Sequence, residues 1–403
     1  MSQQSHPLNI GIIGAGIGGL AAAALCAKAG HRVTLAERFA TPQPLGSGLV
    51  LQPVGLAVLD AIGADARAYG APIAQMLGHA GQRCVLDVSY RADAPGLAIH
   101  RASLFSVLWH AAIAAGITLE TGAGCVAAPL SESKRLILRD HADPLGPFDL
   151  VIDASGAGST LSPMQARPLG YGAVWGTVPW PAQTDLPRNQ LTQRYQAARH
   201  MAGVLPIGQL PDDPTPRAAV FWSVPRAKLD DWPHQDLNHW KAEVSELWPQ
   251  MAPFLTTLQS PTDLTPARYS HGTLRRPYAQ ALAFIGDSAH RASPQLGQGA
   301  NMALLDAFAL TQALRLPIDE ALPRYAQMRR WHVRAYQAMS AAFTPMYQSH
   351  STTLPRLRDH LLAPMATLWP INRFLTALVS GTMLPPVAGM NWPQSTGLTP
   401  PNR

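Results

Sequence analysis

The chain is short of charged residues and of cysteines. Only 14% of its 403 residues are charged, against roughly 25% in an average globular protein, while 47% are hydrophobic. This balance excludes intrinsic disorder for the chain as a whole. The cysteines, Cys26, Cys84 and Cys125, are odd in number and lack C-x-x-C spacing. They therefore exclude a disulfide scaffold and a cysteine zinc site, and we expect no metal and a cytoplasmic location.

The sequence also lacks an apolar run typical of a signal peptide or a membrane helix. Its longest uncharged stretch, residues 9–27, contains five glycines and follows no basic region, which favours a folded turn. The apolar stretch 361–383 is interrupted by Pro364, Pro370 and Arg373. We expect it to be a buried or surface-docking helical tail, for which loose membrane contact is the weaker hypothesis.

Excess positive charge is small. Lys and Arg number 31 against 25 Asp and Glu, giving a formal charge of +6. Around the Arg329-Arg330 pair, helical spacing predicts an apolar stripe of Tyr325, Met328, Trp331 or His332, and Ala335, and a solvated face of Arg324, Arg329, Arg330 and Arg334. We therefore expect no nucleic-acid partner.

The order of residue patterns predicts two packed domains. Residues 8–13, 18–29 and 32–36 read as strand, helix and strand; a helix from 104 to 115 and a strand over 148–152 follow. Residues 165–275 are β-like, and the α/β pattern returns at 282, with a helix over 299–314. We expect an α/β fold with a discontinuous first domain (1–70, 99–164 and 275–340), an inserted β-rich domain (71–98 and 165–274), and a helical, then Pro-rich, C-terminal region (341–403).

A glycine-rich motif follows the first strand. Gly14, Ala15, Gly16, Ile17, Gly18 and Gly19 match G-x-G-x-x-G, and Glu37 ends the second strand. Such glycines let backbone N–H groups approach a pyrophosphate at the helix N-terminus, and the carboxylate can accept ribose hydroxyls. The motif predicts a Rossmann-type dinucleotide site without separating NAD from FAD.

A second motif separates the two cofactors. Asp287 follows an apolar strand, and a loop from Pro294 to Asn301 leads into a helix. The carboxylate can accept ribityl hydroxyls, and the helix N–H groups can stabilise negative charge on a reduced flavin. NAD has no ribityl chain, so the pattern favours FAD.

With these motifs the chain resembles the FAD-dependent aromatic hydroxylases, the class A flavoprotein monooxygenases that include p-hydroxybenzoate and salicylate hydroxylases. The resemblance covers most of the chain up to about residue 340. The resemblance rests on three motifs: Gly14–Gly19 with Glu37-Arg38, the Arg-x-x-Leu of Arg101 to Leu104, and Gly286-Asp287. It implies that Arg101 contacts the diphosphate or ribose, the main chain near Val126 the adenine, Asp287 the ribityl chain, and Pro294, Gly297, Gly299, Ala300 and Asn301 the isoalloxazine.

The resemblance also implies the chemistry. NADH or NADPH would act as a transient donor, O2 would be captured as a flavin C4a-hydroperoxide, and one oxygen atom would pass to an aromatic or related cyclic small molecule. No catalytic base is assigned: Tyr195, Trp222 and His271 fit ordinary core or surface positions better. His290 is expected to pack beside the loop. Substrate identity and oligomeric state stay open.

One motif departs from the family pattern. The family has Asp-Gly-x-x-Ser followed by an Arg, whereas this chain has Ser155-Gly156-Ala157-Gly158-Ser159 and Ser162, so the acid and the base are both missing. An oxidase, dehydrogenase or cyclase on the same scaffold, or an FAD-binding protein without turnover, therefore remain alternatives. A serine hydrolase is not expected, because the near match to G-x-S-x-G at Gly286 has His290 in place of the last glycine.

Overall fold

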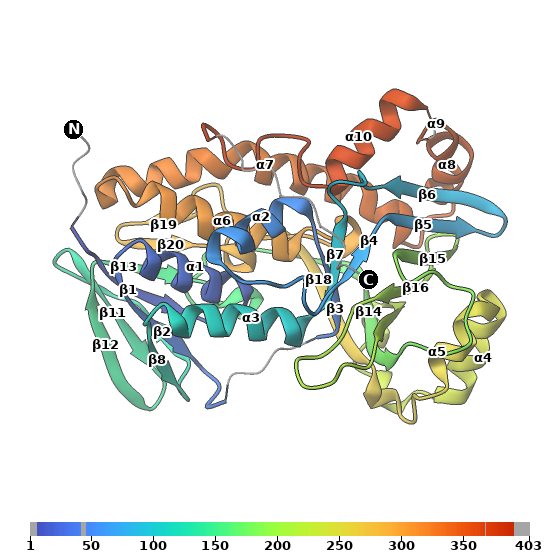
Figure 1. The fold of residues 1–403 in the computed structure, drawn as a ribbon, viewed down its shortest axis with the longest axis horizontal. Helices are drawn as coiled ribbons and strands as arrows, with labels where there is room; N and C mark the ends of the chain where they lie inside the picture. Colours follow the sequence, from blue (N-terminus) through green and yellow to red (C-terminus); the bar gives the residue numbers. More distant parts are fainter. Residues whose placement is uncertain (1–5, 42–45, 367, 391–403) are drawn as a thin grey trace.

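A parallel sheet lies toward one end of the molecule's long axis in the computed structural model, which describes residues 6–41, 46–366 and 368–390 (Figure 1). Its strand order is β19-β20-β13-β1-β2-β8, and only β19 pairs antiparallel. These strands are β1 (Asn9–Ile13), β2 (Arg32–Glu37), β8 (Thr118–Thr121), β13 (Leu150–Asp153), β19 (Tyr278–Ala279) and β20 (Leu282–Phe284). Ile10 and Ile12 of β1 are fully buried, as expected for a parallel strand that is covered on both faces.

Helices cover this sheet. They are α1 (Ile17–Lys28), α2 (Pro53–Ile62), α3 (Arg101–Ala114), α6 (Gly299–Ala313) and the long α7 (Ile318–Tyr347). The alanine-rich α1 is buried from Gly19 to Cys26 and packs against α3 and α6, because small side chains allow close approach. Helix α3 begins at Arg101, earlier than expected, since His100 Nδ1 accepts a hydrogen bond from Ala102 N (3.0 Å) and caps its N-terminus.

A second, largely antiparallel sheet lies at the other end of the molecule (Figure 1). Its order is β21-β18-β14-β17-β16-β15-β5-β6. The strands are β5 (Gln75–Ala80), β6 (Arg83–Ser89), β14 (Arg167–Pro179), β15 (Gln190–Gln196), β16 (His200–Pro206), β17 (Arg217–Pro225), β18 (Thr265–Thr273) and β21 (His290–Arg291). The region also contains α4 (Leu237–Leu247) and α5 (Ala252–Leu255), which pack with Trp222 in a core on one face of this sheet.

Two small sheets complete the β structure. One has the order β3-β7-β4, and the other joins β9, β10, β11 and β12. Their strands are β3 (Gly48–Leu51), β4 (Ala71–Ile73), β7 (Gly96–His100), β9 (Cys125–Ala127), β10 (Leu130–Ser131), β11 (Lys134–Arg139) and β12 (Ala142–Phe148). Segments 71–98 and 165–274 thus share the antiparallel sheet, while the proposed domain boundaries stay a prediction.

The C-terminal region is helical after α7. It contains α8 (Thr353–Leu357), a π-helical turn (Arg358–Leu362), α9 (Ala363–Ala366) and α10 (Trp369–Val379). Within the described ranges, no helix is both long and apolar enough to cross a membrane. Residues 391–403 of the expected Pro-rich tail lie outside the described residues.

One surface prediction was wrong. Arg329 is 2% exposed and pairs with the buried Asp306, whereas Trp331 is 61% exposed and His332 is buried. The helical spacing of the stripe was correct, but α7 turns Arg329 toward α6, where a buried carboxylate offsets its charge. Arg324, Arg330 and Arg334 are exposed as expected.

Candidate functional site

The Gly14–Gly19 turn joins β1 to α1 in a conformation that requires its glycines. Gly14 has a φ of +98°, and a Cβ on Gly19 would lie 1.9 Å from Gly14 O. A Cβ on Gly16, by contrast, would have no neighbour within 4 Å. Helix α1 has neither a side-chain cap nor an acidic residue in its first turn. Its first N–H groups can therefore serve an anion beside Gly16.

Glu37 lies directly beside this turn. Its carboxylate is buried and accepts hydrogen bonds from Ala15 N (2.7 Å) and Phe39 N (3.1 Å). These contacts hold the turn in place and leave lone pairs of the two carboxylate oxygens for a ligand. Sequence reasoning proposed the ribose contact but missed this anchoring role.

Arg38 and Val126 lie near each other at the outer end of the site. Arg38 is exposed and stacks on Phe39, with 4.5 Å from its guanidinium carbon to the ring centroid. Val126, on β9, is exposed, and a Cβ on neighbouring Gly124 would lie 3.7 Å from Arg38 Cβ. The structure thus places Arg38, a predicted cofactor residue, close to the strand of Val126, which was predicted at the adenine.

Asp287 lies in the turn Gly286–Ser288 that follows β20. Asp287 is accessible to solvent, whereas Gly286 and Ser288 on either side of it are buried. Burial raises the pKa of Asp287, while the positive charges of His290, Arg101 and Arg291 oppose the rise. Arg101 is therefore close enough to Asp287 to influence its pKa, although the two residues are distant in sequence.

The loop after β21 delivers the N-terminus of α6. Gly297 has a φ of +61°, and a Cβ on Gly299 would meet no atom within 4 Å. Gln298, the residue before the helix, makes no side-chain cap, and the first turn contains no acid. Pro294 starts a short 3-10 turn, with the Ser293 hydroxyl accepting from Gln295 N (3.4 Å). The N–H groups of α6 are thus open to a partly negative ligand edge.

Asn301 has a different task from the one expected. Its Oδ1 accepts from Gln52 N (2.8 Å), and its Nδ2 donates to Val50 O and Gly297 O (both 3.1 Å). The buried amide therefore joins the β3–α2 junction to the loop, and its polar atoms bind backbone rather than facing a ligand. We infer that Asn301 positions the loop.

A buried ion-pair network lies beneath the loop. Asp306 accepts from His290 Nε2 (2.6 Å), Arg329 Nε (2.7 Å) and Gly286 N (2.9 Å). Burial alone would raise the pKa of Asp306, but the charges and hydrogen bonds of His290 and Arg329 outweigh it and lower the pKa to about 2. The network anchors the backbone next to Asp287, and His290 packs beside the loop as predicted.

An acid that sequence reasoning overlooked lies just before the Ser155–Ser159 motif, the one that differs from the family pattern. Asp153, at the end of β13, is fully buried. It accepts hydrogen bonds from Ser155 N (3.0 Å) and from the hydroxyls of Ser155 and Ser159. Ser162 Oγ in turn donates to Ser288 O (2.6 Å), beside Asp287. This acid thus lies two residues before Ser155, the position at which the family has its Asp. Both of its carboxylate oxygens accept hydrogen bonds from the serines.

Two buried amides were also missed. Tyr90 donates to Gln52 Oε1 (2.7 Å), while Gln52 Nε2 has no hydrogen-bond partner and lies 3.6 Å from where a Cβ on Gly297 would be. Gln298 Nε2 donates to Val379 O (2.6 Å), but its Oε1 is also without a partner. These are two of six buried side-chain atoms without a partner in the described residues, and both are available to a water molecule or a ligand. Sequence alone shows neither, because their partners are remote.

Aromatic residues of the antiparallel sheet approach the loop. Gln295 Nε2 lies 3.9 Å from Met201 Sδ, and Trp175 packs on Phe221 with ring centroids 4.4 Å apart. Trp175 Nε1 donates to Tyr269 Oη (2.8 Å). Burial raises the pKa of Tyr269 to about 12, with Arg101 opposing the rise. The loop therefore contacts the antiparallel sheet at Met201, which packs in one cluster with Phe221 and Trp175.

Three other candidates have protein partners. Tyr195 is buried and donates to Gln193 Oε1 (3.0 Å), Trp222 packs in the core with α4, and His271 Nε2 lies 3.1 Å from Ser340 Oγ. The described residues contain no cluster of His, Cys, Asp or Glu suited to a metal ion.

These residues fit an FAD molecule. The carboxyl ends of β1, β13 and β20 meet at one edge of the parallel sheet, where the strand order reverses. Two uncapped helix N-termini, α1 and α6, follow β1 and the Asp287 loop. The open space at Gly16 and the uncapped N-terminus of α6 occur at the two ends that the pyrophosphate and the flavin ring of FAD would occupy.

The comparisons with known proteins agree with this fit. Residues 8–340 match the family model described as "FAD binding domain". The chain belongs to this family of FAD-dependent aromatic hydroxylases. The α/β fold, the FAD cofactor and the monooxygenase class expected from the sequence are thereby confirmed.

The individual relatives have low sequence identity to this chain, but the matches cover most of it. A probable 2-heptyl-3-hydroxy-4(1H)-quinolone synthase of Rhodococcus erythropolis is 27% identical over 82% of this chain and 86% of its own length. The 3-amino-4-hydroxybenzoate 2-monooxygenase of Streptomyces cremeus is 28% identical over 80% and 85%. The solved structure of Klebsiella pneumoniae HpxO, complexed with FAD and uric acid, superposes with a TM-score of 0.77 at 21% identity, covering 94% of this chain and 98% of that one.

Proposed function

We propose that this monooxygenase hydroxylates a nitrogen-containing aromatic or related cyclic small molecule, with NADH or NADPH as transient donor and O2 as co-substrate. The chemistry that FAD supplies when bound is uptake of a hydride from the nicotinamide and activation of O2. In the balanced reaction, one oxygen atom replaces a ring hydrogen as hydroxyl, and the other leaves as water. The nicotinamide gives the two electrons, and a proton comes from solvent.

The observation that carries this proposal is that two helix N-termini without side-chain caps, α1 and α6, follow β1 and the loop after Asp287, while β1, β13 and β20 end at one edge of the parallel sheet. We assign the pyrophosphate to the turn of Gly14, Ala15, Gly16, Gly18 and Gly19, and the ribose to Glu37. Arg38 and Val126 would flank the adenine, Arg101 the diphosphate, and Asp287 the ribityl chain. Pro294, Gly297, Gly299 and Ala300 would border the ring, with Asn301 as a positioning residue.

The substrate class rests on polar groups beside the loop. The three proteins named above are named for, or bound to, a quinolone, an aminohydroxybenzoate and uric acid. The first and third are nitrogen heterocycles and the second is a benzene ring with an amino substituent, so each carries nitrogen in or on its ring. Gln52 Nε2 offers an unpaired donor and Gln298 Oε1 an unpaired acceptor, which suit a ring that carries N–H beside an oxygen substituent. The half-buried ring of Trp175, which packs on the buried Phe221, suits a ring face.

Anaerobic stopped-flow absorbance tests the reaction. Purified protein with bound flavin is mixed with NADH or NADPH, with and without hydroxyquinolines, aminophenols and phenols. We expect nicotinamide to bleach the flavin, and an effective ring compound to accelerate bleaching and to be hydroxylated once O2 is admitted. Flavin that neither nicotinamide reduces would contradict the proposal and favour an oxidase, a cyclase or a silent scaffold.

A pair of variants tests the substrate edge. Gln52→Leu should weaken substrate binding about tenfold, because one hydrogen bond to a buried ligand is lost, without changing FAD affinity by more than about twofold. Gln348→Leu is the control, since Gln348 is also a buried amide with an unpaired oxygen but bonds to Gly172 on the antiparallel sheet. Equal effects of the two variants in a substrate titration would remove Gln52 from the site.

A further inference from the structure

The segment after α7 turns apolar side chains toward solvent. Leu357, Leu361 and Met365 recur at helical spacing across α8, the π-helical turn and α9, and are 40–51% exposed. Leu368, Trp369 and Phe374 continue the exposed set into α10, with Trp369 74% exposed. Half of the large hydrophobic side chains that are exposed in the described residues lie in this short segment, so they form a cluster rather than a scatter.

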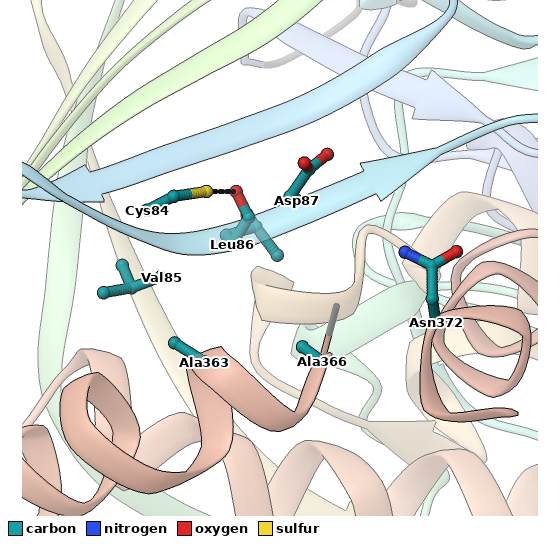
Figure 2. A pocket seen from close by; sticks show the side chains of 7 residues that line it. All are labelled: Cys84, Val85, Leu86, Asp87, Ala363, Ala366 and Asn372. Carbon is teal, nitrogen blue, oxygen red and sulfur yellow. Dashed lines mark hydrogen bonds between the residues drawn. The ribbon is translucent and has the colours of Figure 1, made fainter. Parts of the chain in front are cut away.

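The opposite side of this segment is fixed to the protein. Ala363 and Ala366 point toward β6 above a small pocket that Cys84 and Asn372 also line (Figure 2). Arg358 is 1% exposed and donates to Met346 O (2.9 Å) and Ala197 O (3.2 Å). If the segment rotated so that its apolar side chains became buried, Arg358 would lose these hydrogen bonds. The apolar side chains are therefore exposed in the folded protein.

Basic side chains predominate around the apolar cluster, since the nearby acid of β6, Asp87, is half-buried and accepts from Gln75 Nε2 (2.7 Å). Arg356 and Arg373 are exposed in the segment, and Arg83 of β6 lies against His360, 2.6 Å from Arg83 Nη1 to His360 Nδ1. The acid of the segment, Asp359, is already paired with Arg358 at 2.6 Å. Leucine, tryptophan and phenylalanine bordered by arginine have the composition of helices that lie in the interface of an anionic bilayer.

We propose that the face formed by Leu357, Leu361, Met365, Leu368, Trp369 and Phe374, here called the C-terminal face, docks on the surface of an anionic lipid bilayer. A second copy of the chain is a poorer occupant, because a two-fold contact would place Arg356 and Arg373 of both copies in one interface, while Asp359 and Asp87 are already bonded to Arg358 and Gln75. Helix α10 reaches the flavin loop through the Gln298–Val379 hydrogen bond. Docking would therefore bring the site close to lipophilic ring compounds dissolved in the bilayer.

Vesicle co-sedimentation of the FAD-loaded protein tests the docking. We expect binding to vesicles of phosphatidylcholine mixed with phosphatidylglycerol and at least about tenfold weaker partitioning to phosphatidylcholine alone. Leu361→Ser/Trp369→Ser should lower partitioning to the anionic vesicles by about tenfold or more. Ile113→Ser, at a similarly exposed position on α3, should behave as wild type. Circular dichroism confirms that each variant is folded.

Three results would overturn the proposal. Wild-type protein could remain in the supernatant with anionic vesicles, or the double variant could sediment as wild type does. Light scattering could instead show a wild-type dimer that the double variant converts to a monomer, which would make the C-terminal face a self-association surface. None of these readouts depends on hydroxylation, so the docking and the proposed reaction fail separately.

Discussion

Asp287 and Asp306 lie on either side of one loop but are held in opposite ways. Burial acts to raise the pKa of both carboxyls. The pKa of Asp287 is raised, because the nearby cations oppose the effect of burial only partly. For Asp306, direct hydrogen bonds from His290 and Arg329 reverse the effect and lower the pKa to about 2. A fully buried carboxylate that is paired with protein groups supports the fold, whereas one that solvent reaches is available to a ligand.

The largest effect should follow removal of the Asp306 charge. Asp306→Asn leaves Arg329 and His290 buried without a counter-charge, which should cost about 3–5 kcal/mol of unfolding free energy. Urea unfolding of the FAD-free protein measures this, with the exposed Asp212→Asn as the control, expected to change by less than about 0.5 kcal/mol. A loss below about 1 kcal/mol for Asp306→Asn would show that the network is not a support.

The same carboxylate predicts a pH dependence. Its folded pKa of about 2 lies below the value of about 3.9 for an unfolded aspartate. Stability from ionised Asp306 is thus present above about pH 4 and is lost as the pH falls toward 2, on the order of 2 kcal/mol in total. Unfolding midpoints between pH 5 and 2 should show this loss in wild type and a smaller one in Asp306→Asn. Parallel curves would contradict the assignment.

Asp153 offers an intermediate case. Ser159→Ala removes one hydroxyl donor from this buried carboxylate and should destabilise the protein by about 1–3 kcal/mol. Ser133→Ala, on the exposed strand connection, is the matched control. If both variants unfold at the same urea concentration, the serine hydroxyls do not stabilise the buried carboxylate of Asp153. The altered motif would then need another explanation.

The smallest effect on the fold is expected at Asp287. Asp287→Asn should not destabilise the FAD-free protein, because the raised pKa means that the ionised carboxylate is disfavoured in the folded state. FAD affinity should nevertheless fall about tenfold or more with the loss of a charged acceptor. A variant that unfolds as readily as Asp306→Asn would remove the contrast between the two acids.

Sequence reasoning reached those parts of the molecule that local patterns determine. The β1–α1–β2 unit, Glu37 and Asp287 follow from glycine spacing and strand ends, which are local. The partners of Arg329, Asp153 and Gln52 come from tertiary packing. A helical stripe cannot show that a buried acid on α6 will draw an arginine inward, and the motif comparison at Ser155 did not consider an acid two positions earlier. The apolar stretch after residue 361 was recognised, but its outward orientation depends on Arg358.

The most direct test of the central claim is FAD titration of Gly16→Ala. The structure leaves open space around Gly16, and its φ of −78° suits alanine, so the FAD-free protein should unfold as wild type within about 0.5 kcal/mol. If the pyrophosphate lies against this turn, the added methyl group should raise the Kd for FAD at least about tenfold, about 1.4 kcal/mol. An unchanged Kd in an equally stable variant would contradict the assignment of the dinucleotide to the Gly14–Gly19 turn.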